Sequence, residues 1–319
     1  MQIGEQGMTL IAIIGAGFVG TEVAKHLILR GVGDIVLIDV RREKAEGEAL
    51  DLSHMASMLG IDVTITGTND YSAITNADIV VMCAGTIRKP GMTREQLLDT
   101  NLSIAMNVAR EIEKYCPKAK IVVVTNPVEP LVYTFLKMLS KPREEVFGFG
   151  AALDSSRLRY AVARKLGKPV SKVEALVMGQ HGQKMVMIFS HTFVEGRPVK
   201  EILPPETLDE IRKEVLEAGA RILELKGWSS THAPGPGIAA LVEAMAKGNR
   251  IVQPVSIMLK GEYGLTDVVL STPCIIGSRG IEKVIEIDLD EDEKKMLLEA
   301  AEYVKKLMKC VDEKLSKSS

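Results

Sequence analysis

The sequence has few cysteines and little net charge, and it contains no long apolar run. Its 319 residues include four cysteines, and the formal net charge is −2. No CxxC pair or metal-ligand spacing relates the cysteines, which favours free thiols, a reducing cytoplasm and the absence of a metal site. The weak charge gives no electrostatic basis for binding nucleic acid or an anionic membrane. No apolar run approaches the ~20 residues of a membrane-spanning helix, and residues 1–7 do not form a signal peptide.

The sequence also lacks internal repeats and any low-complexity linker. Its length predicts two domains, and its content of 46% hydrophobic and 26% charged residues is that of a globular protein. The pattern of elements changes near residue 150, so we predict domains over residues 1–150 and 151–319. Without a linker between them, the two domains are expected to pack tightly, with the site between them.

The chain is organised around a stretch near its N-terminus. Residues 10–14 are consecutive apolar residues, typical of a buried parallel strand, and residues 21–28 carry apolar side chains at helical spacing. Between them lies a GxGxxG pattern in which Gly15 permits a tight turn, Gly17 lets a pyrophosphate approach the backbone, and Gly20 lets helix and strand pack closely. The start of the new helix would bind the phosphates through its free N–H groups. This arrangement predicts a dinucleotide site.

An acidic residue follows the next apolar run. Asp39 comes directly after residues 35–38 and lies 19 residues beyond Gly20, where a carboxylate would accept the ribose hydroxyls. Its charge would repel a 2′-phosphate, which favours NAD as the cofactor. Arg41 and Arg42 either soften that preference or are solvated loop charges. The competing interpretation is an ordinary strand–helix–strand unit with a chance acid.

Strands and helices alternate through the first 150 residues, which predicts an α/β domain with a doubly wound parallel sheet, the Rossmann arrangement. Further strands are expected over residues 62–66, 77–85, 120–125 and 146–150, and helices over 43–59 and 97–115. After residue 150 the pattern is that of an α+β domain. There we expect helices over 155–166, 207–226, 235–247 and 290–309, and strands of a more antiparallel sheet over 173–178, 185–192 and 268–270.

Four polar clusters stand at strand ends or helix starts, over residues 86–94, 126–129, 153–159 and 178–182. Together they indicate one mechanism. Protonated His181 would give its proton to a substrate carbonyl as hydride arrives, and Asp154 would orient and charge the imidazole. Arg157 offers a bidentate fork for a substrate carboxylate, and Arg94 would stabilise charge on the carbonyl oxygen. Alternatively, Asp154 and Arg157 pair only with each other, and the cations of residues 86–94 are a solvated loop.

In order and combination, these clusters closely resemble the lactate/malate dehydrogenase family over nearly the whole chain; the matching segments are residues 15–20, 85–94, 124–127, 153–157 and 179–182. The resemblance implies that His181 is the proton donor and acceptor, with Asp154 as its partner and Arg157 as the carboxylate clamp. It also implies that Arg94 polarises the carbonyl from a mobile loop that closes over the substrate, and that Asn126 contacts both substrate and nicotinamide. The predicted contacts to NAD are Gly15, Gly17, Phe18, Val19, Gly20, Asp39, Asn101 and Asn126.

Arg88 matches the loop position that separates the two activities of this family, where lactate dehydrogenases usually have glutamine and malate dehydrogenases have arginine. A water-excluded site needs a cation for each substrate carboxylate, so Arg88 favours a dicarboxylate. The resemblance thus implies reversible hydride transfer between malate and oxaloacetate, as in the tricarboxylic acid cycle, by a homotetramer or a dimer. Two positions depart from the family: Gln180 stands where an acid is frequent, and Ser229 matches the substrate-side segment only loosely.

Three other functions compete with this one. Another 2-hydroxyacid dehydrogenase, chiefly lactate dehydrogenase, would use the same proton-transfer pair, but Arg88 argues against it. An NAD-dependent glycosidase of related fold would require Mn²⁺, which no cysteine–histidine pattern supports. A catalytically inactive NAD-binding protein would have no need of the His181 and Asp154 pair.

Overall fold

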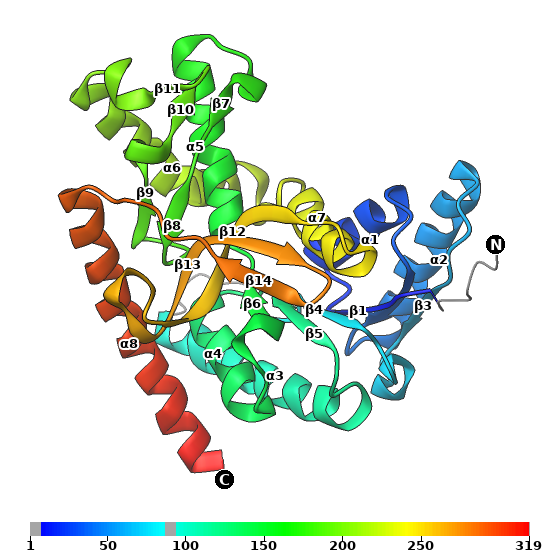
Figure 1. The fold of residues 1–319 in the computed structure, drawn as a ribbon. Coiled ribbons are helices and arrows are strands. Elements are labelled where there is room, and N and C mark those ends of the chain that lie inside the picture. The colour runs from blue at the N-terminus through cyan, green and yellow to red at the C-terminus, as the bar shows by residue number, and fades with distance from the viewer. Residues whose placement is uncertain (1–7, 87–93, 319) are drawn as a thin grey trace, which may run out of the picture.

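The computed structural model describes residues 8–86 and 94–318, and it is built on one large sheet (Figure 1). Six strands form its parallel part in the order β3-β2-β1-β4-β5-β6. The strands are β1 (Leu10–Ile14), β2 (Asp34–Ile38), β3 (Ile65–Thr68), β4 (Ile79–Met82), β5 (Lys120–Val123) and β6 (Val146–Gly148). The strand order reverses between β1 and β4, which is the point where such sheets bind ligands. The predicted doubly wound parallel sheet is confirmed.

Helices connect these strands: α1 (Phe18–Leu29), α2 (Arg42–Leu59), α3 (Arg94–Tyr115) and α4 (Val128–Leu139). The strands form because their apolar runs are covered on both faces, and Ile11, Ile13, Val80 and Val81 are fully buried. The following helix, α5 (Ala151–Leu166), starts three residues after β6 and leads into the second half of the chain.

The second half continues the same sheet with antiparallel strands. β12 (Ile251–Lys260) pairs with β6 through Ser256 and Gly148, and β13 (Thr266–Gly277) pairs along the other side of β12. Beyond β13 lie β8 (Val177–Gly179) and β9 (Met185–Met187), and β14 (Gly280–Val284) also pairs with β13. A small separate sheet holds β7 (Val173–Glu174), β10 (Phe193–Val194) and β11 (Arg197–Pro198). The expected second α+β part is therefore present, but its main sheet is joined to the first.

Three more long helices complete this half: α6 (Pro205–Lys226), α7 (Pro234–Lys247) and α8 (Glu291–Ser318). α7 packs beside α1, and α8 packs on β13 and also on α4 (Figure 1). The contacts of α7 with α1 and of α8 with α4 cross between the two halves. The main apolar core accordingly includes Ile11 of β1, Leu241 of α7, Val269 of β13 and Val304 of α8. None of the helices in residues 8–86 and 94–318 has the length and apolar character of a membrane span.

Several predicted strand bounds are wrong. Residues 173–178 form two strands in different sheets, and the strand expected over 185–192 ends at Met187 before a short 3₁₀ turn. The ten-residue β12 and the shorter β14 were not predicted, and residues 268–270 are only part of β13. β3 begins three residues later than expected because its partner β2 pairs with it only from Ile35↔Ile65 onward. The helices expected over 207–226 and 235–247 are confirmed, while the last helix extends to Ser318.

Candidate active site

The glycine-rich turn joins β1 to α1 in the geometry that the GxGxxG pattern predicts. Gly15 has φ +105°, and a Cβ at this position would lie 2.7 Å from the backbone of Ala84. At Gly20 a Cβ would lie 2.1 Å from the Gly15 carbonyl oxygen, so only glycine lets helix and strand approach this closely. A Cβ at Gly17 would meet only Lys44 Nζ, at 4.0 Å, so space is left above the turn.

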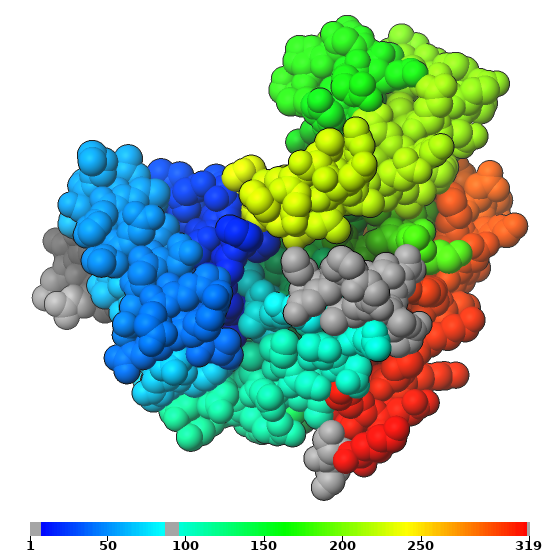
Figure 2. Space-filling model, turned by 180° about the vertical axis from the view of Figure 1, so that it is seen from behind, coloured from blue at the N-terminus to red at the C-terminus, as the bar shows by residue number. Residues whose placement is uncertain are grey.

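The start of α1 has free donors beside this space. The first helical hydrogen bond runs from the Thr21 N–H to the Gly17 carbonyl, at 2.9 Å. The N–H groups of Phe18, Val19 and Gly20 therefore have no acceptor within the helix, and they lie at its positive end. Seen from behind, dark blue atoms from the start of the chain border the yellow segment that leads into α7, and the surface is hollowed below that segment (Figure 2). These residues fit the pyrophosphate of a dinucleotide.

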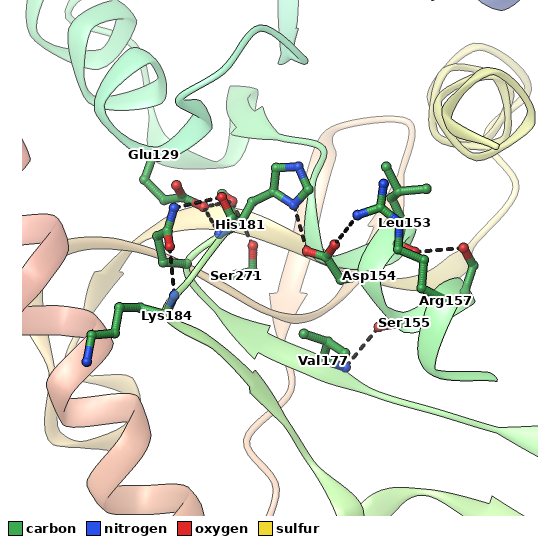
Figure 3. A network of polar contacts seen from close by, with 12 residues as sticks. Glu129, Leu153, Asp154, Ser155, Arg157, Val177, His181, Lys184 and Ser271 are labelled. Carbon is green, nitrogen blue, oxygen red and sulfur yellow. Dashed lines mark hydrogen bonds and ion pairs between the residues drawn. The ribbon is translucent and has the colours of Figure 1, made fainter. Parts of the chain in front are cut away.

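The predicted proton-transfer pair, His181 and Asp154, lies where the two halves meet (Figure 3). His181 follows β8, and its Nδ1 is 2.6 Å from Oδ2 of Asp154, which stands in the first turn of α5. Arg157, one turn further along α5, donates from one terminal nitrogen to Oδ1 of Asp154 at 3.0 Å. Asp154 is fully buried and lies between the other two side chains. It therefore pairs with Arg157, as the alternative had it, and at the same time bonds to the imidazole.

The surroundings of His181 favour the charged form of its ring. Burial disfavours an imidazolium, but the charge and hydrogen bond of Asp154, together with Glu129 whenever that carboxyl group is ionised, outweigh burial and raise the His181 pKa above 6.5. Arg157 opposes this by repulsion. Because Nδ1 faces Asp154, the other ring nitrogen is left to exchange a proton with a substrate.

Arg157 has a donor without a hydrogen-bond partner in the described part of the chain. Its Nε–H is buried and has no hydrogen-bond partner among the described residues, and its side chain is 16% exposed. A buried guanidinium N–H without an acceptor is costly, and a carboxylate is the group that a guanidinium fork fits best. This atom indicates an anion beside the imidazole.

Comparison with known proteins gives the same picture. The family model described as the lactate/malate dehydrogenase NAD-binding domain matches residues 9–148, and the family's alpha/beta C-terminal domain matches residues 151–315. The malate dehydrogenase of Aeropyrum pernix is 42% identical over 306 residues, which is 96% of this chain and 99% of that protein. The chain belongs to the lactate/malate dehydrogenase family. Its N-terminal half is the family's NAD-binding domain, and NAD is its cofactor.

Solved structures of both branches of the lactate/malate dehydrogenase family have this fold. The apo structure of malate dehydrogenase from Picrophilus torridus has a TM-score of 0.94 at 36% identity, covering 98% of this chain and 100% of that one. Lactate dehydrogenase from Eimeria maxima, solved with NADH and oxamate, has a TM-score of 0.91 at 34% identity, covering 98% and 96%. The fold therefore establishes the family but does not choose between the two substrates.

The remaining predicted site residues of this lactate/malate dehydrogenase have different settings. Asn126 lies three residues after β5 and forms a cis peptide bond with Pro127. The side chain of Asn101 accepts from the Thr86 N–H at 2.8 Å and donates to the Asn126 carbonyl at 2.7 Å, so it links the segments that follow β4 and β5. Arg88 lies outside the described residues, as does the side chain of Arg94, the first residue of α3. Their direct contacts to cofactor or substrate stay predictions.

Ser229 lies on the segment between α6 and α7 and is exposed. Its neighbour Trp228 stacks on Phe18 with ring centroids 5.5 Å apart, which places this segment of the family fold over the glycine-rich turn. The substrate contact predicted for Ser229 stays a prediction.

Three residues of the site were not assigned a role from the sequence. Glu129 accepts the His181 main-chain N–H at 2.8 Å. Gln180 donates to the His181 carbonyl at 2.7 Å and accepts from the Lys184 N–H at 3.1 Å, so it fixes this turn without adding a charge. Lys44 lies 3.7 Å from the Asp39 carboxylate. The signal for Glu129 was its place three residues after Asn126, at the start of a helix.

The setting of Asp39 determines how the family's NAD preference can be changed. Its Oδ1 accepts from the Arg41 N–H at 3.1 Å, and its side chain is only 13% exposed. Arg42 instead pairs with Glu46 at 2.7 Å on the exposed face of α2. The cations near the acid are therefore Arg41 and Lys44.

We expect Asp39→Ser to raise the ratio of kcat/KM for NADPH to that for NADH by about tenfold, roughly 1.4 kcal/mol. The substitution removes the charge that repels a 2′-phosphate and leaves Arg41 and Lys44 to bind it. Initial rates with both cofactors measure the ratio. Arg42→Ser is the matched control and is expected to leave it unchanged, since Arg42 is engaged with Glu46. A ratio that Asp39→Ser does not move would contradict the role of Asp39.

Proposed function

We propose that the chain is an NAD-dependent malate dehydrogenase that interconverts malate and oxaloacetate. The observation that carries the chemistry is the cluster of three side chains on α5 and after β8. It offers a proton donor on His181, a fixed negative charge on Asp154, and an unused buried N–H on Arg157. A 2-oxoacid needs such a set, because its carbonyl must be protonated and its adjacent carboxylate must be held.

In this mechanism NAD supplies and accepts the hydride, and the chain's residues control the substrate and the proton. The free face of the Arg157 guanidinium holds the C1 carboxylate, which brings the C2 carbonyl to the outer nitrogen of His181. Protonated His181 gives its proton to the carbonyl oxygen as C2 gains hydride, so oxaloacetate becomes malate. In the reverse direction neutral His181 takes the proton of the hydroxyl group, and Asp154 stabilises the imidazolium that forms.

Malate is preferred over lactate for two reasons. The sequence places Arg88 in the segment that distinguishes the two activities, where it would pair with the second carboxylate of oxaloacetate. Relatives such as those of Aeropyrum pernix and Pyrobaculum aerophilum, each 42% identical, are named malate dehydrogenases. Lactate dehydrogenase is the second candidate, because the Eimeria maxima lactate dehydrogenase shares this fold.

The deciding experiment is NADH oxidation by the purified chain with oxaloacetate and pyruvate side by side. A strong preference for oxaloacetate supports the proposal. A preference for pyruvate would keep the proton-transfer pair but reject malate as the substrate. Activity with neither would reject the dehydrogenase altogether.

Replacing Arg157 with lysine is expected to lower kcat/KM for oxaloacetate by about 1.5–3 kcal/mol, the range for a hydrogen bond to a charged group. Lysine keeps the charge but cannot offer the planar fork, and its single nitrogen cannot bond both Asp154 and a substrate carboxylate in this geometry. Steady-state kinetics measure the loss. Arg164→Lys, on the exposed face of the same helix, is the matched control with unchanged kinetics expected. Wild-type kinetics in Arg157→Lys would remove the carboxylate clamp from the mechanism.

We also propose that the chain acts in the cytoplasm as a homotetramer and serves the tricarboxylic acid cycle. The four cysteines are free thiols, as is usual for proteins of a reducing compartment. The tetramer rests on the family resemblance, with a dimer as the alternative. Size-exclusion chromatography with light scattering distinguishes the two.

A further inference from the structure

A second buried carboxyl group lies beside His181. Glu129 stands in the first turn of α4 and its side chain is fully buried. Its Oε1 accepts from the His181 main-chain N–H at 2.8 Å and from the Ser256 hydroxyl at 3.1 Å (Figure 3). The Ser256 hydroxyl in turn lies 2.7 Å from that of Ser271. Glu129 thus holds the backbone of the residue whose ring Asp154 holds.

A row of small residues across the sheet leaves room for the Glu129 carboxyl group. Gly148 of β6, Ser256 of β12, Ser271 of β13 and Gly179 of β8 are successive partners across four strands. Gly148 is closely confined, since a Cβ there would lie 2.2 Å from Val128. The row therefore crosses from the NAD-binding half to the strand that precedes His181.

The other oxygen of Glu129 differs from every oxygen of Asp154. Oε2 of Glu129 is buried and has no partner among the described residues, whereas both oxygens of Asp154 have partners, namely the His181 ring and Arg157. An ionised carboxylate would place half its charge on an unsolvated Oε2. A neutral acid removes the charge, and the hydroxyl group that it leaves unpaired on Oε2 costs less than an unpaired ionised oxygen.

The groups around Glu129 act in opposite directions. Burial raises its pKa above 4.5 despite the opposing effect of the His181 N–H, the His181 charge and the Ser256 hydroxyl. Its place at the start of α4 also favours an anion. The charged groups on this side are His181 and, behind it on α5, Asp154 and Arg157, while β12 and β13 contribute the neutral hydroxyls of Ser256 and Ser271. Burial outweighs the rest.

The His181 backbone needs such an anchor. Gly179 and Gly182 on either side have φ +84° and +148°, so the turn is built from residues with wide conformational freedom. The ring nevertheless fits tightly, since a Cβ on Gly150 at the start of α5 would lie 2.6 Å from the His181 Cβ. A small shift of the backbone would move the imidazole away from Asp154 or into Gly150.

We propose that Glu129 is a positioning residue of the proton-transfer centre, acting as an uncharged carboxylic acid that holds the His181 backbone while Asp154 alone supplies the charge for its ring. This inference rests on the proposed dehydrogenase function. In this proposal Glu129 fixes the position of the His181 backbone, and Asp154 provides the negative charge beside its ring.

Two variants of similar size test the two parts of the proposal. Glu129→Gln keeps an acceptor oxygen and is neutral at every pH. It is expected to retain kcat within about threefold and the pH profile of the wild type, because the amide oxygen still accepts a hydrogen bond from the His181 N–H. Glu129→Met removes the acceptor and leaves the His181 N–H unpaired. It is expected to lower kcat for oxaloacetate by about tenfold or more, with the KM for NADH unchanged.

The titration of the His181 imidazole, followed by histidine NMR and assigned with His181→Asn, gives a readout that needs no turnover. An unchanged titration midpoint in Glu129→Gln supports the uncharged acid, and a clear downward shift would show that Glu129 carries a charge. Wild-type kcat in Glu129→Met would reject the positioning role. If Glu129→Met fails to fold, Glu129→Asp, whose carboxyl group is one methylene further from the N–H, is expected to lower kcat, and its failure to do so would equally reject the role.

The experiments distinguish an error in the role of Glu129 from an error in the proposed malate dehydrogenase activity. Wild-type protein without oxaloacetate activity would reject the malate dehydrogenase, while the NMR midpoints of wild type and Glu129→Gln would still report the charge on Glu129. A normal wild-type enzyme whose Glu129 variants behave differently from these expectations would reject only the role of Glu129.

Discussion

Replacing His181 with asparagine is expected to lower kcat for oxaloacetate reduction by about 10²–10⁴-fold, the usual contribution of general acid catalysis. Asparagine preserves a side-chain donor toward Asp154 but has no proton to give to a carbonyl. NADH binding is expected to be unchanged, because the GxGxxG turn and Asp39 lie on β1, α1 and β2. The measurements are single-turnover rates and the NADH dissociation constant.

The titration of His181 predicts how the rate in each direction of the reaction changes with pH. The His181 pKa is raised, so the imidazolium is present below that raised value and is lost as pH increases through it. Oxaloacetate reduction by wild type should therefore decline through this pH range, while malate oxidation, which needs the neutral ring, should rise. In His181→Asn the pH-dependent decline of oxaloacetate reduction and the rise of malate oxidation, which are the two pH limbs, are both expected to disappear.

His191 provides the matched control for this substitution. It lies on a 3₁₀ turn of the second half and contacts the Ser190 hydroxyl at 3.0 Å. His191→Asn is expected to retain wild-type turnover and both pH limbs. Substantial activity in His181→Asn, with its pH limbs intact, would transfer the proton-transfer role to another group.

Replacing Arg88 with glutamine is expected to weaken oxaloacetate reduction by about 2–5 kcal/mol in kcat/KM, the cost of removing one partner of a buried ion pair. Arg88 lies outside the described residues, so this expectation comes from the sequence and from the chemistry of a dicarboxylate in a water-excluded site. Pyruvate lacks the second carboxylate, so its kcat/KM should not fall. The measurement is kcat/KM for both substrates.

Lys89→Gln is the matched control for Arg88→Gln, since it removes a neighbouring cation without touching the arginine fork. Its kinetics are expected to stay close to those of the wild type, because no contact with a substrate carboxylate is assigned to Lys89. Equal losses in the two variants would mean that the segment acts through its overall charge. Unchanged oxaloacetate kinetics in Arg88→Gln would leave specificity unexplained by this residue.

The NAD-binding half could be predicted well from the sequence because its strands are buried on both faces. Their unbroken apolar runs, such as residues 10–14, need no knowledge of their neighbours. The second half was predicted less well. In β12, Gln253 and Pro254 interrupt the apolar pattern, and the strand exists because Gln253 and Pro254 lie opposite Cys274 and Pro273 on β13. Such pairing is set by tertiary contacts that no local pattern contains.

The site shows the same division. His181, Asp154 and Arg157 were recognisable because their residue types at strand ends and helix starts suit one reaction, and the structure brings them together. Glu129 was not assigned a role, because an acid in the first turn of a helix is ordinarily an exposed residue that interacts with the helix dipole. Its burial follows from the packing of α4 over β12. Lys44 lies near Asp39 because it stands in the first turn of α2, which begins shortly after that acid.

The stack of Trp228 on Phe18 has an optical consequence. Trp228 is the only tryptophan of the chain, so all indole emission from this protein originates beside the nucleotide-binding turn. Reduced nicotinamide absorbs light in the range where indole emits, and energy transfer between them depends steeply on distance. Quenching of this one fluorophore can therefore follow NADH binding directly, in wild type and in variants that no longer turn over.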